Sequence, residues 1–502
     1  MFRIFGPPGT GKTTTLLNMV DTAIQEGTDP SNIAFLAFTR KAAYEAKERA
    51  ARRFDLNPDK DLPYFRTLHS LAYMMLGLKE SQLMQKEHFD ELSNKIGITL
   101  TVRSAVLDED DVGLITSDHP IIGLINLARL KKTTLRTEYN RSDIEEEWMT
   151  VDYVNRAYHD YKKAHGLIDY TDMLVEFVDN AVNYCPEFDL CFMDEAQDLS
   201  PLQWDIAHAL DKRAKSMYAA GDDDQAIYKW AGADVDYFIE LQSGSEVLEQ
   251  SYRIPAEVHK VAARISSRIQ NRFPKKYLPR KETGKVQRIY SISEIDMSEG
   301  DWLIMAQANY MLSSVATQLK YDGYLFERNG HRSISEKIST AVNGWERLRK
   351  GHQIDCNTAQ AIYDYMTGNG VRIARGFKRF SEHDKDKSFD LPTLQLQYGL
   401  GADDTMIWHE AMDKLPVVDQ IYITSLLRRR EKFNAVPRIR LSTIHGAKGG
   451  EADNVVLFTD LSTAALKERG DDIHRVFYVA VTRTRQNLYI VEPEDVLRSY
   501  TI

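Results

Sequence analysis

Short apolar runs alternate with amphipathic segments along most of the 502 residues of this chain. The run Met1–Phe5 has the length of a short buried strand, and apolar side chains then recur at helical spacing over residues 13–24. Further apolar runs predict strands at 190–193, 217–220 and 488–491, and a strand followed by a helix within 302–326. Strands that alternate with helices are typical of an α/β fold, in which helices cover both faces of a parallel sheet.

Two long stretches interrupt this alternation. Residues 86–164 have apolar positions at helical spacing, for instance Ile121, Leu124 and Ile125, and residues 331–435 have a helix-rich composition. We therefore expect a mainly helical insertion at each place.

A glycine-rich loop lies between the first predicted strand and the first predicted helix. It reads Gly6, Pro7, Pro8, Gly9, Thr10, Gly11, Lys12, Thr13 and Thr14. In this context the pattern G-x-x-x-x-G-K-[ST] predicts a phosphate cradle, because loop N–H groups and a helix N-terminus attract an anion. Lys12 would reach the β- and γ-phosphates, and Thr13 would bind Mg²⁺. We expect the chain to use a nucleoside triphosphate.

Two carboxylates follow the predicted strand at 190–193. In P-loop enzymes an acid at this place holds Mg²⁺, which we assign to Asp194, and Glu195 stands where a general base could take a proton from water. The strand at 217–220 leads into Gly221–Ala233, a segment that suits a sensor loop beside the γ-phosphate. Tyr228 and Trp230 in this segment are either a stacking surface for bases or core residues.

Charge and hydropathy narrow the class of protein. The net charge of −10 argues weakly against nucleic acid, but basic residues gather at 264–288, 372–379 and 428–432. Such a basic run is usually a solvated surface, yet three of them are compatible with a groove that binds the phosphates of a nucleic-acid backbone. There is no run long enough to span a membrane and no signal-like N-terminus, so we expect a cytoplasmic protein.

Eight short motifs follow one another along the chain. They are Phe38–Ala43 (FTRKAA), Thr67–Ser70 (TLHS), Asp169–Leu174 (DYTDML), Asp194–Asp198 (DEAQD), Gly221–Ala233 (GDDDQAIYKWAGA), Leu248–Arg253 (LEQSYR), Thr443–Glu451 (TIHGAKGGE) and Phe477–Arg485 (FYVAVTRTR). In wording and order they resemble the motifs of the UvrD-like helicases of superfamily 1, the UvrD/Rep/PcrA group.

The resemblance implies roles for individual residues. Gln225 would sense the γ-phosphate, Tyr252 would stack on the adenine of ATP and Glu451 would bind its ribose. Arg253 and Arg483 would reach the γ-phosphate from the second motor domain, as guanidinium groups do in other phosphoryl-transfer sites. Single-stranded DNA would be contacted by Phe38, Thr39, His69, Tyr228, Trp230, Thr443 and His445.

The chain departs from the family pattern at three places. The family has a glutamine motif upstream of the P-loop, whereas Met1 opens directly on the strand, so Tyr252 would provide more of the adenine recognition. Ala231 stands where the family usually has Arg, and Gly450 where it has Leu. None of these changes touches the carboxylates or the arginine pair.

The resemblance also implies the architecture: two RecA-like P-loop motor domains, each with a mainly helical insertion. The first motor domain would comprise residues 1–85 and 165–247, with the insertion at 86–164. The second would comprise 248–330 and 436–502, with its insertion at 331–435, which is shorter than is usual in the family.

The implied function is that of an ATP-dependent single-stranded-DNA translocase and DNA helicase that moves 3′→5′ on single strands and tailed duplexes, with Mg²⁺. Alternatives within the motor class are a translocase that strips proteins from DNA and the motor subunit of a helicase–nuclease assembly; replication, repair or nuclease proteins would be its partners. A P-loop kinase has no use for paired arginines after a second set of sheet motifs. A scaffold without ATPase activity would not need the complete set of Lys12, Asp194, Glu195, Gln225, Arg253 and Arg483.

Overall fold

The computed structural model describes residues 1–101, 119–467 and 470–502. By its contacts the chain divides into two compact units, each made of separate stretches of sequence. The first comprises Met1–Thr283 and residues 468–482, and the second comprises Gly284–Lys467 and Arg483–Ile502. In this grouping by contacts, residues 248–283 and 470–482 belong to the first unit, whereas the resemblance placed them in the second motor domain.

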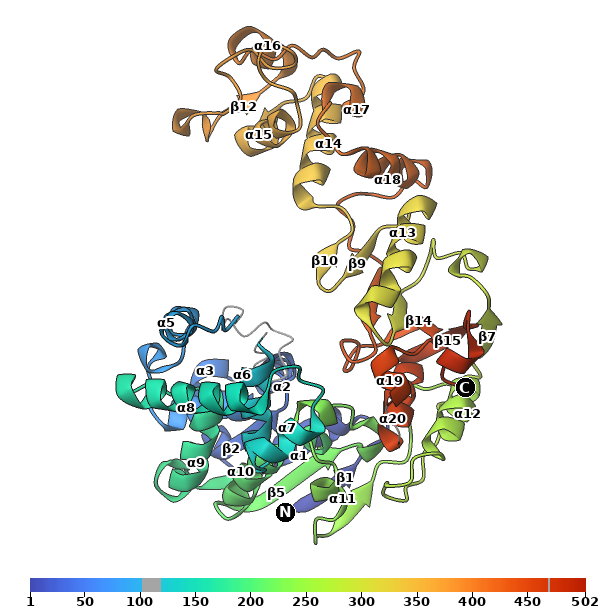
Figure 1. Ribbon diagram of the computed structural model, residues 1–502. Coiled ribbons are helices and arrows are strands. Elements are labelled where there is room, and N and C mark those ends of the chain that lie inside the picture. The colour runs from blue at the N-terminus through green and yellow to red at the C-terminus, as the bar shows by residue number, and fades with distance from the viewer. Residues whose placement is uncertain (102–118, 468–469) are drawn as a thin grey trace. The chain divides into compact units, whose positions relative to one another are not determined.

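The first unit is built on a parallel sheet with strand order β3-β2-β4-β5-β1-β6. Its strands are β1 (Phe2–Phe5), β2 (Ile33–Ala37), β3 (Phe65–Thr67), β4 (Phe188–Met193), β5 (Ala214–Gly221) and β6 (Ser245–Val247). Around it lie α1 (Lys12–Gln25), α2 (Arg40–Phe54), α3 (Pro58–Asp61), α4 (Leu68–Met75), α9 (Tyr170–Tyr184), α10 (Pro201–Asp211) and α11 (Asp236–Ile239) (Figure 1). By contacts the unit also includes α12 (Ala256–Ser266) and α20 (Asp471–Val481).

Alternate side chains of the strands enter two separate cores, one on each face of the sheet. On β2, Ile33 and Phe35 pack with the apolar faces of α1 and α2, whereas Ala34 and Leu36 pack with α4, α9 and α10. All five residues of β2 are buried. A strand that is apolar throughout is typical of a parallel sheet covered on both faces, so the expected α/β layering is confirmed.

The described part of the first insertion is helical. It contains α5 (Lys86–Ile96), α6 (Pro120–Leu130), α7 (Leu135–Arg141) and α8 (Trp148–His165). Ile121, Leu124 and Ile125 of α6 are buried in a core of their own with residues of α5 and α8, as their spacing predicted.

The second unit is built on a second sheet, with strand order β10-β9-β13-β8-β14-β15-β7, in which only the β10–β9 pair is antiparallel among the described strands. Its strands are β7 (Lys285–Ile289), β8 (Trp302–Ala306), β9 (Phe326–Arg328), β10 (His331–Arg332), β13 (Ile439–Thr443), β14 (Ala452–Phe458) and β15 (Thr484–Val491), and α13 (Leu312–Asp322) and α19 (Thr463–Lys467) connect them. The prediction of an α/β fold with two motor domains, each built on its own sheet, is thereby confirmed.

The second insertion carries α14 (Glu336–Arg349), α15 (Cys356–Asp364), α16 (Leu391–Gln397), α17 (Trp408–Ala411), α18 (Val417–Arg428) and a small antiparallel pair, β11 (Ile354–Asp355) and β12 (Ser388–Phe389) (Figure 1). Its core centres on the fully buried Trp345, whose indole N–H donates a hydrogen bond to the Met406 carbonyl at 2.9 Å.

Candidate nucleotide and DNA site

The glycine-rich loop joins β1 to α1 and has the backbone shape that a phosphate cradle requires. Gly9 and Gly11 adopt positive φ angles of 75° and 81°, which favour glycine. A Cβ on Gly6 would lie 2.1 Å from Cγ of Lys12, so only glycine leaves room for that side chain. The Lys12 ammonium donates to the Gly6 carbonyl at 2.8 Å and is therefore held inside the loop.

Strands β1, β5 and β4 are neighbours, and their carboxyl ends bring the loop and the two predicted carboxylates to one edge of the sheet. The Thr13 hydroxyl donates to Oδ2 of Asp194 at 2.9 Å, and the Lys12 ammonium lies 3.8 Å from Oε1 of Glu195. Burial, followed by the charge of Glu195, raises the pKa of Asp194 to about 6. The Thr13 hydroxyl and the Asp194 carboxylate therefore place two oxygen atoms side by side, and such a pair fits Mg²⁺, which prefers oxygen ligands.

Glu195 belongs to a chain of hydrogen bonds that ends at Gln225. The Gln197 amide donates to Oε2 of Glu195 at 2.6 Å, and its oxygen accepts from the Asp222 backbone N–H at 2.9 Å. The Gln225 amide in turn donates to Oδ2 of Asp222 at 2.7 Å. The proposed base and the proposed sensor are therefore joined through Gln197 and Asp222, to which sequence reasoning gave no role. The signal available in the sequence was an amide two positions after the acid pair.

The segment that carries Tyr252 and Arg253 lies against the glycine-rich loop. The Tyr252 backbone N–H donates to the Gly9 carbonyl at 2.8 Å, and the Ser251 hydroxyl donates to the Pro8 carbonyl at 2.9 Å. A Cβ on Gly9 would come within 2.3 Å of Cβ of Arg253. The Tyr252 side chain is 74% exposed, so its ring is accessible for stacking on a planar group such as a base. By contacts this segment belongs to the first unit, whereas the resemblance assigned it to the second motor domain.

Other predicted residues lie together in the second unit. Arg483 is buried, and its guanidinium donates to the Gly450 carbonyl at 3.3 Å, next to Glu451. The Glu451 carboxylate lies 3.5 Å from the Arg485 guanidinium. Thr443 ends β13 and its hydroxyl accepts from the Gly446 N–H at 3.1 Å, which shapes the turn that contains His445.

The predicted DNA-contact residues of the first unit follow the carboxyl ends of β2, β3 and β5. Phe38 comes directly after β2, and its ring centroid lies 5.5 Å from that of Tyr228. Tyr228 is buried, as the core interpretation expected, whereas Trp230 is 58% exposed and is not a core residue. Thr39 caps α2 by accepting from the Ala42 N–H at 3.1 Å.

His69 has a different environment from the exposed Trp230. It is buried on α4, and burial, with a smaller contribution from the charge of Arg40, lowers its pKa to about 4. The ring is therefore neutral at physiological pH.

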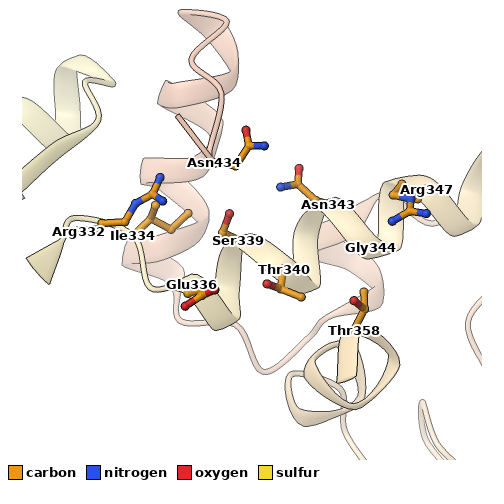
Figure 2. A pocket seen from close by; sticks show the side chains of 10 residues that line it. All are labelled: Arg332, Ile334, Glu336, Ser339, Thr340, Asn343, Gly344, Arg347, Thr358 and Asn434. Carbon is orange, nitrogen blue, oxygen red and sulfur yellow. The ribbon is translucent and has the colours of Figure 1, made fainter. Parts of the chain in front are cut away.

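A polar cavity of about 270 Å³ lies in the second insertion, between α14, α15 and the segment before β13 (Figure 2). The two arginines that line it form hydrogen bonds with backbone carbonyls of the insertion. Arg332 donates to the Ala435 carbonyl at 2.8 Å, and Arg347 donates to the Gln353 carbonyl at 2.9 Å. None of the predicted site residues lines this cavity. It is a feature of the insertion and not a part of the nucleotide site.

The loop, the paired carboxylates and the sheet edge define a P-loop nucleotide site. Family models agree with this class: that of the UvrD/REP helicase N-terminal domain matches residues 2–245, and that of the UvrD-like helicase C-terminal domain matches residues 438–491. The chain belongs to the UvrD/REP helicase family, as the sequence motifs predicted.

Relatives with curated descriptions carry helicase names. The chain is 26% identical over 439 residues to the ATP-dependent DNA helicase PcrA of Leuconostoc citreum. The aligned region covers 82% of this chain and 55% of the relative. It is 25% identical to a probable DNA helicase II homolog of Rickettsia conorii, over 98% of this chain and 91% of the relative, and 21% identical to that of Mycoplasma genitalium, over 97% and 82%. The chain thus spans about half the length of the PcrA relative. In the part of the chain that the structure describes, no helix has the length and apolarity to cross a membrane.

Proposed function

We propose that this protein is an ATP-dependent motor that translocates along single-stranded DNA and unwinds tailed duplexes with 3′→5′ polarity. The proposal is supported above all by the loop 221–233, which holds Gln225 beside the nucleotide residues at one end and presents Trp230 to solvent at the other. A short connection between a phosphate sensor and an exposed aromatic ring is suited to coupling ATP hydrolysis to base binding.

At the nucleotide, Lys12 would bind the β- and γ-phosphates and Glu195 would take the proton of the attacking water. Mg²⁺, held by Thr13 and Asp194, would supply positive charge that neutralises the phosphates. Gln225 would orient the water and the γ-phosphate, because its amide is already fixed by Asp222. Tyr252 would stack on the adenine, and Arg253, Arg483 and Glu451 would take the roles that the family resemblance implies.

At the DNA, Trp230 would stack on a base while Phe38 and Tyr228 support it from the sheet edge. Base–aromatic stacking contributes about 1–3 kcal/mol per base and tolerates any sequence, as a translocase needs. His69, Thr39, Thr443 and His445 are proposed as further contacts to the strand.

The test has two stages. ATP hydrolysis is measured with and without poly(dT), and unwinding is then measured on duplexes with a 3′ or a 5′ single-stranded tail at equal protein and saturating ATP. We expect poly(dT) to stimulate hydrolysis and the 3′-tailed duplex to be unwound. Preferential unwinding of the 5′-tailed duplex would overturn the polarity, and stimulation without any unwinding would favour a translocase that displaces bound proteins.

A further inference from the structure

Three consecutive aspartates, Asp222, Asp223 and Asp224, follow β5 and are fully buried. Burying an ionised carboxylate is costly unless a cation and hydrogen bonds compensate it. The loop that holds the sensor residue Gln225 therefore depends on the cations that meet these three groups.

Lys275 meets all three. Its ammonium lies 3.2 Å from Oδ1 of Asp222, 2.5 Å from Oδ1 of Asp223 and 2.9 Å from Oδ2 of Asp224, and the side chain is 1% exposed. Burial alone would lower the pKa of Lys275, but the three carboxylates outweigh it and hold the pKa above its ordinary value. Lys275 is therefore a buried, charged residue that contacts all three aspartates of this loop.

Arg272 also forms an ion pair with this loop, and it makes a different set of contacts. Its guanidinium binds both oxygens of Asp224, with Nε at 2.8 Å from Oδ1 and Nη2 at 2.5 Å from Oδ2. No ion pair of the described chain joins it to Asp222. Both cations neutralise the loop, but only Lys275 reaches the aspartate that holds Gln225.

Asp222 connects Lys275 to two residues of the proposed hydrolysis site. Its Oδ2 accepts from the Gln225 amide, and its backbone N–H donates to Gln197, whose amide donates to Glu195. A shift of Asp222 would therefore move both the sensor and the group that orients the base.

We propose that Lys275 is a positioning residue for ATP hydrolysis, acting through Asp222 on Gln225 and, through Gln197, on Glu195. This inference rests on the proposed function, because it assigns Lys275 to the same hydrolysis step. The sequence placed Lys275 in a basic run at 264–288 that could have followed DNA phosphates, and its burial removes it from any such surface.

The experiment compares Lys275→Met with Arg272→Met in the full chain. Each variant removes one cation from the same carboxylate cluster while keeping a long side chain. In the poly(dT)-stimulated ATPase assay we expect Lys275→Met to lower kcat at least about tenfold with a KM for ATP within about threefold of the parent, the split that a group acting on the chemical step produces. We expect kcat of Arg272→Met to stay within about twofold of the parent. Equal losses of kcat in both variants, or an unchanged kcat in Lys275→Met, would overturn the inference.

A second variant separates positioning from folding. Lys275→Met combined with Asp223→Asn removes one buried carboxylate along with the cation, so its Tm should return toward that of the parent while kcat stays low. Recovery of kcat in this double variant would mean that Lys275 only neutralises charge, and the inference would fail. A parent chain without poly(dT)-stimulated hydrolysis would instead overturn the proposed function itself, whereas an active parent with an unaffected Lys275→Met would overturn only the role of Lys275.

Discussion

The hydroxyl of Thr13 donates a hydrogen bond to Oδ2 of Asp194 at 2.9 Å, although 181 positions separate the two residues. Thr13 is the second residue of α1, the helix after β1, and Asp194 follows β4, so the pair joins two different strand ends of one sheet. The two oxygens that would bind Mg²⁺ are therefore held next to each other. Such preorganisation lowers the cost of binding.

Lys12 and Glu195 should affect ATP hydrolysis in different ways. Lys12→Ala removes the ammonium held in the loop, so both ATP binding and turnover should fall. Glu195→Gln keeps the shape but removes the base, so ATP should still bind while kcat falls by about 10²-fold or more. Binding of a fluorescent ATP analogue and steady-state ATPase rates measure both effects. Near-normal turnover in Glu195→Gln would remove Glu195 as the base.

Gly6→Ala should weaken nucleotide binding, because the added methyl group would meet Cγ of Lys12 at 2.1 Å and displace the ammonium. Gly368→Ala is the matched control, since the nearest atom to its added Cβ, Cδ of Lys378, lies at 3.9 Å and the backbone there needs no positive φ. Titration with the fluorescent ATP analogue should show a higher Kd only for Gly6→Ala. Equal affinities in the two variants would contradict the crowding argument.

Trp230→Ala should weaken binding of single-stranded DNA and uncouple hydrolysis from unwinding, at a cost of about 1–3 kcal/mol for one lost stacking contact. The control is Tyr321→Ala on α13, because Tyr321 is also well exposed, at 75%, but has no proposed contact with DNA. Fluorescence anisotropy of labelled oligo(dT) measures the affinity at several salt concentrations. The salt slope should be the same for parent and variant, since it reports phosphate contacts. An unchanged affinity for Trp230→Ala would leave this ring without a role on DNA.

The stability of the protein should depend on His69 between about pH 6.5 and pH 4. Because the folded-state pKa of His69 is lowered to about 4, the unfolded chain takes up the proton first as the pH falls. The stability contributed by the neutral buried ring is full above pH 6.5 and is lost as the pH falls toward 4, by up to about 3 kcal/mol. Urea unfolding across this range should be less pH-dependent in His69→Gln than in the parent, whereas the exposed His352→Gln should behave like the parent. Identical pH profiles for His69→Gln and the parent would contradict the prediction.

Local patterns were sufficient to predict the elements that carry the nucleotide site. The strand before the glycine-rich loop, the helix after it and the strand before Asp194 were each predicted within a few residues of β1, α1 and β4. In these places the signal is contained in a short window, because apolar runs define the strands and the loop requires glycine.

Contacts between distant segments could not be read in the same way. Lys275 and Asp223 are 52 positions apart, and nothing in either neighbourhood indicates that they meet. A run of basic residues is normally solvated, so its composition concealed one lysine that is buried. The grouping of 248–283 with the first unit has the same origin, because it involves hydrogen bonds from the Ser251 and Tyr277 hydroxyls to the distant Pro8 carbonyl.

Helix α20 belongs to the first compact unit but comes from a stretch of sequence far beyond the rest of that unit. Its residues Val476–Val481 are buried, and Arg475 donates to the Asp223 carbonyl at 3.0 Å. Apart from the stretch 468–482, all residues of this unit precede position 284. During synthesis, N-terminal domains generally fold before the chain is complete. Here the nucleotide-binding unit cannot close its packing until residue 482 has left the ribosome. Most of this unit is therefore synthesised well before the helix that completes its packing, and a nascent chain arrested before α20 would expose the surface that this helix covers.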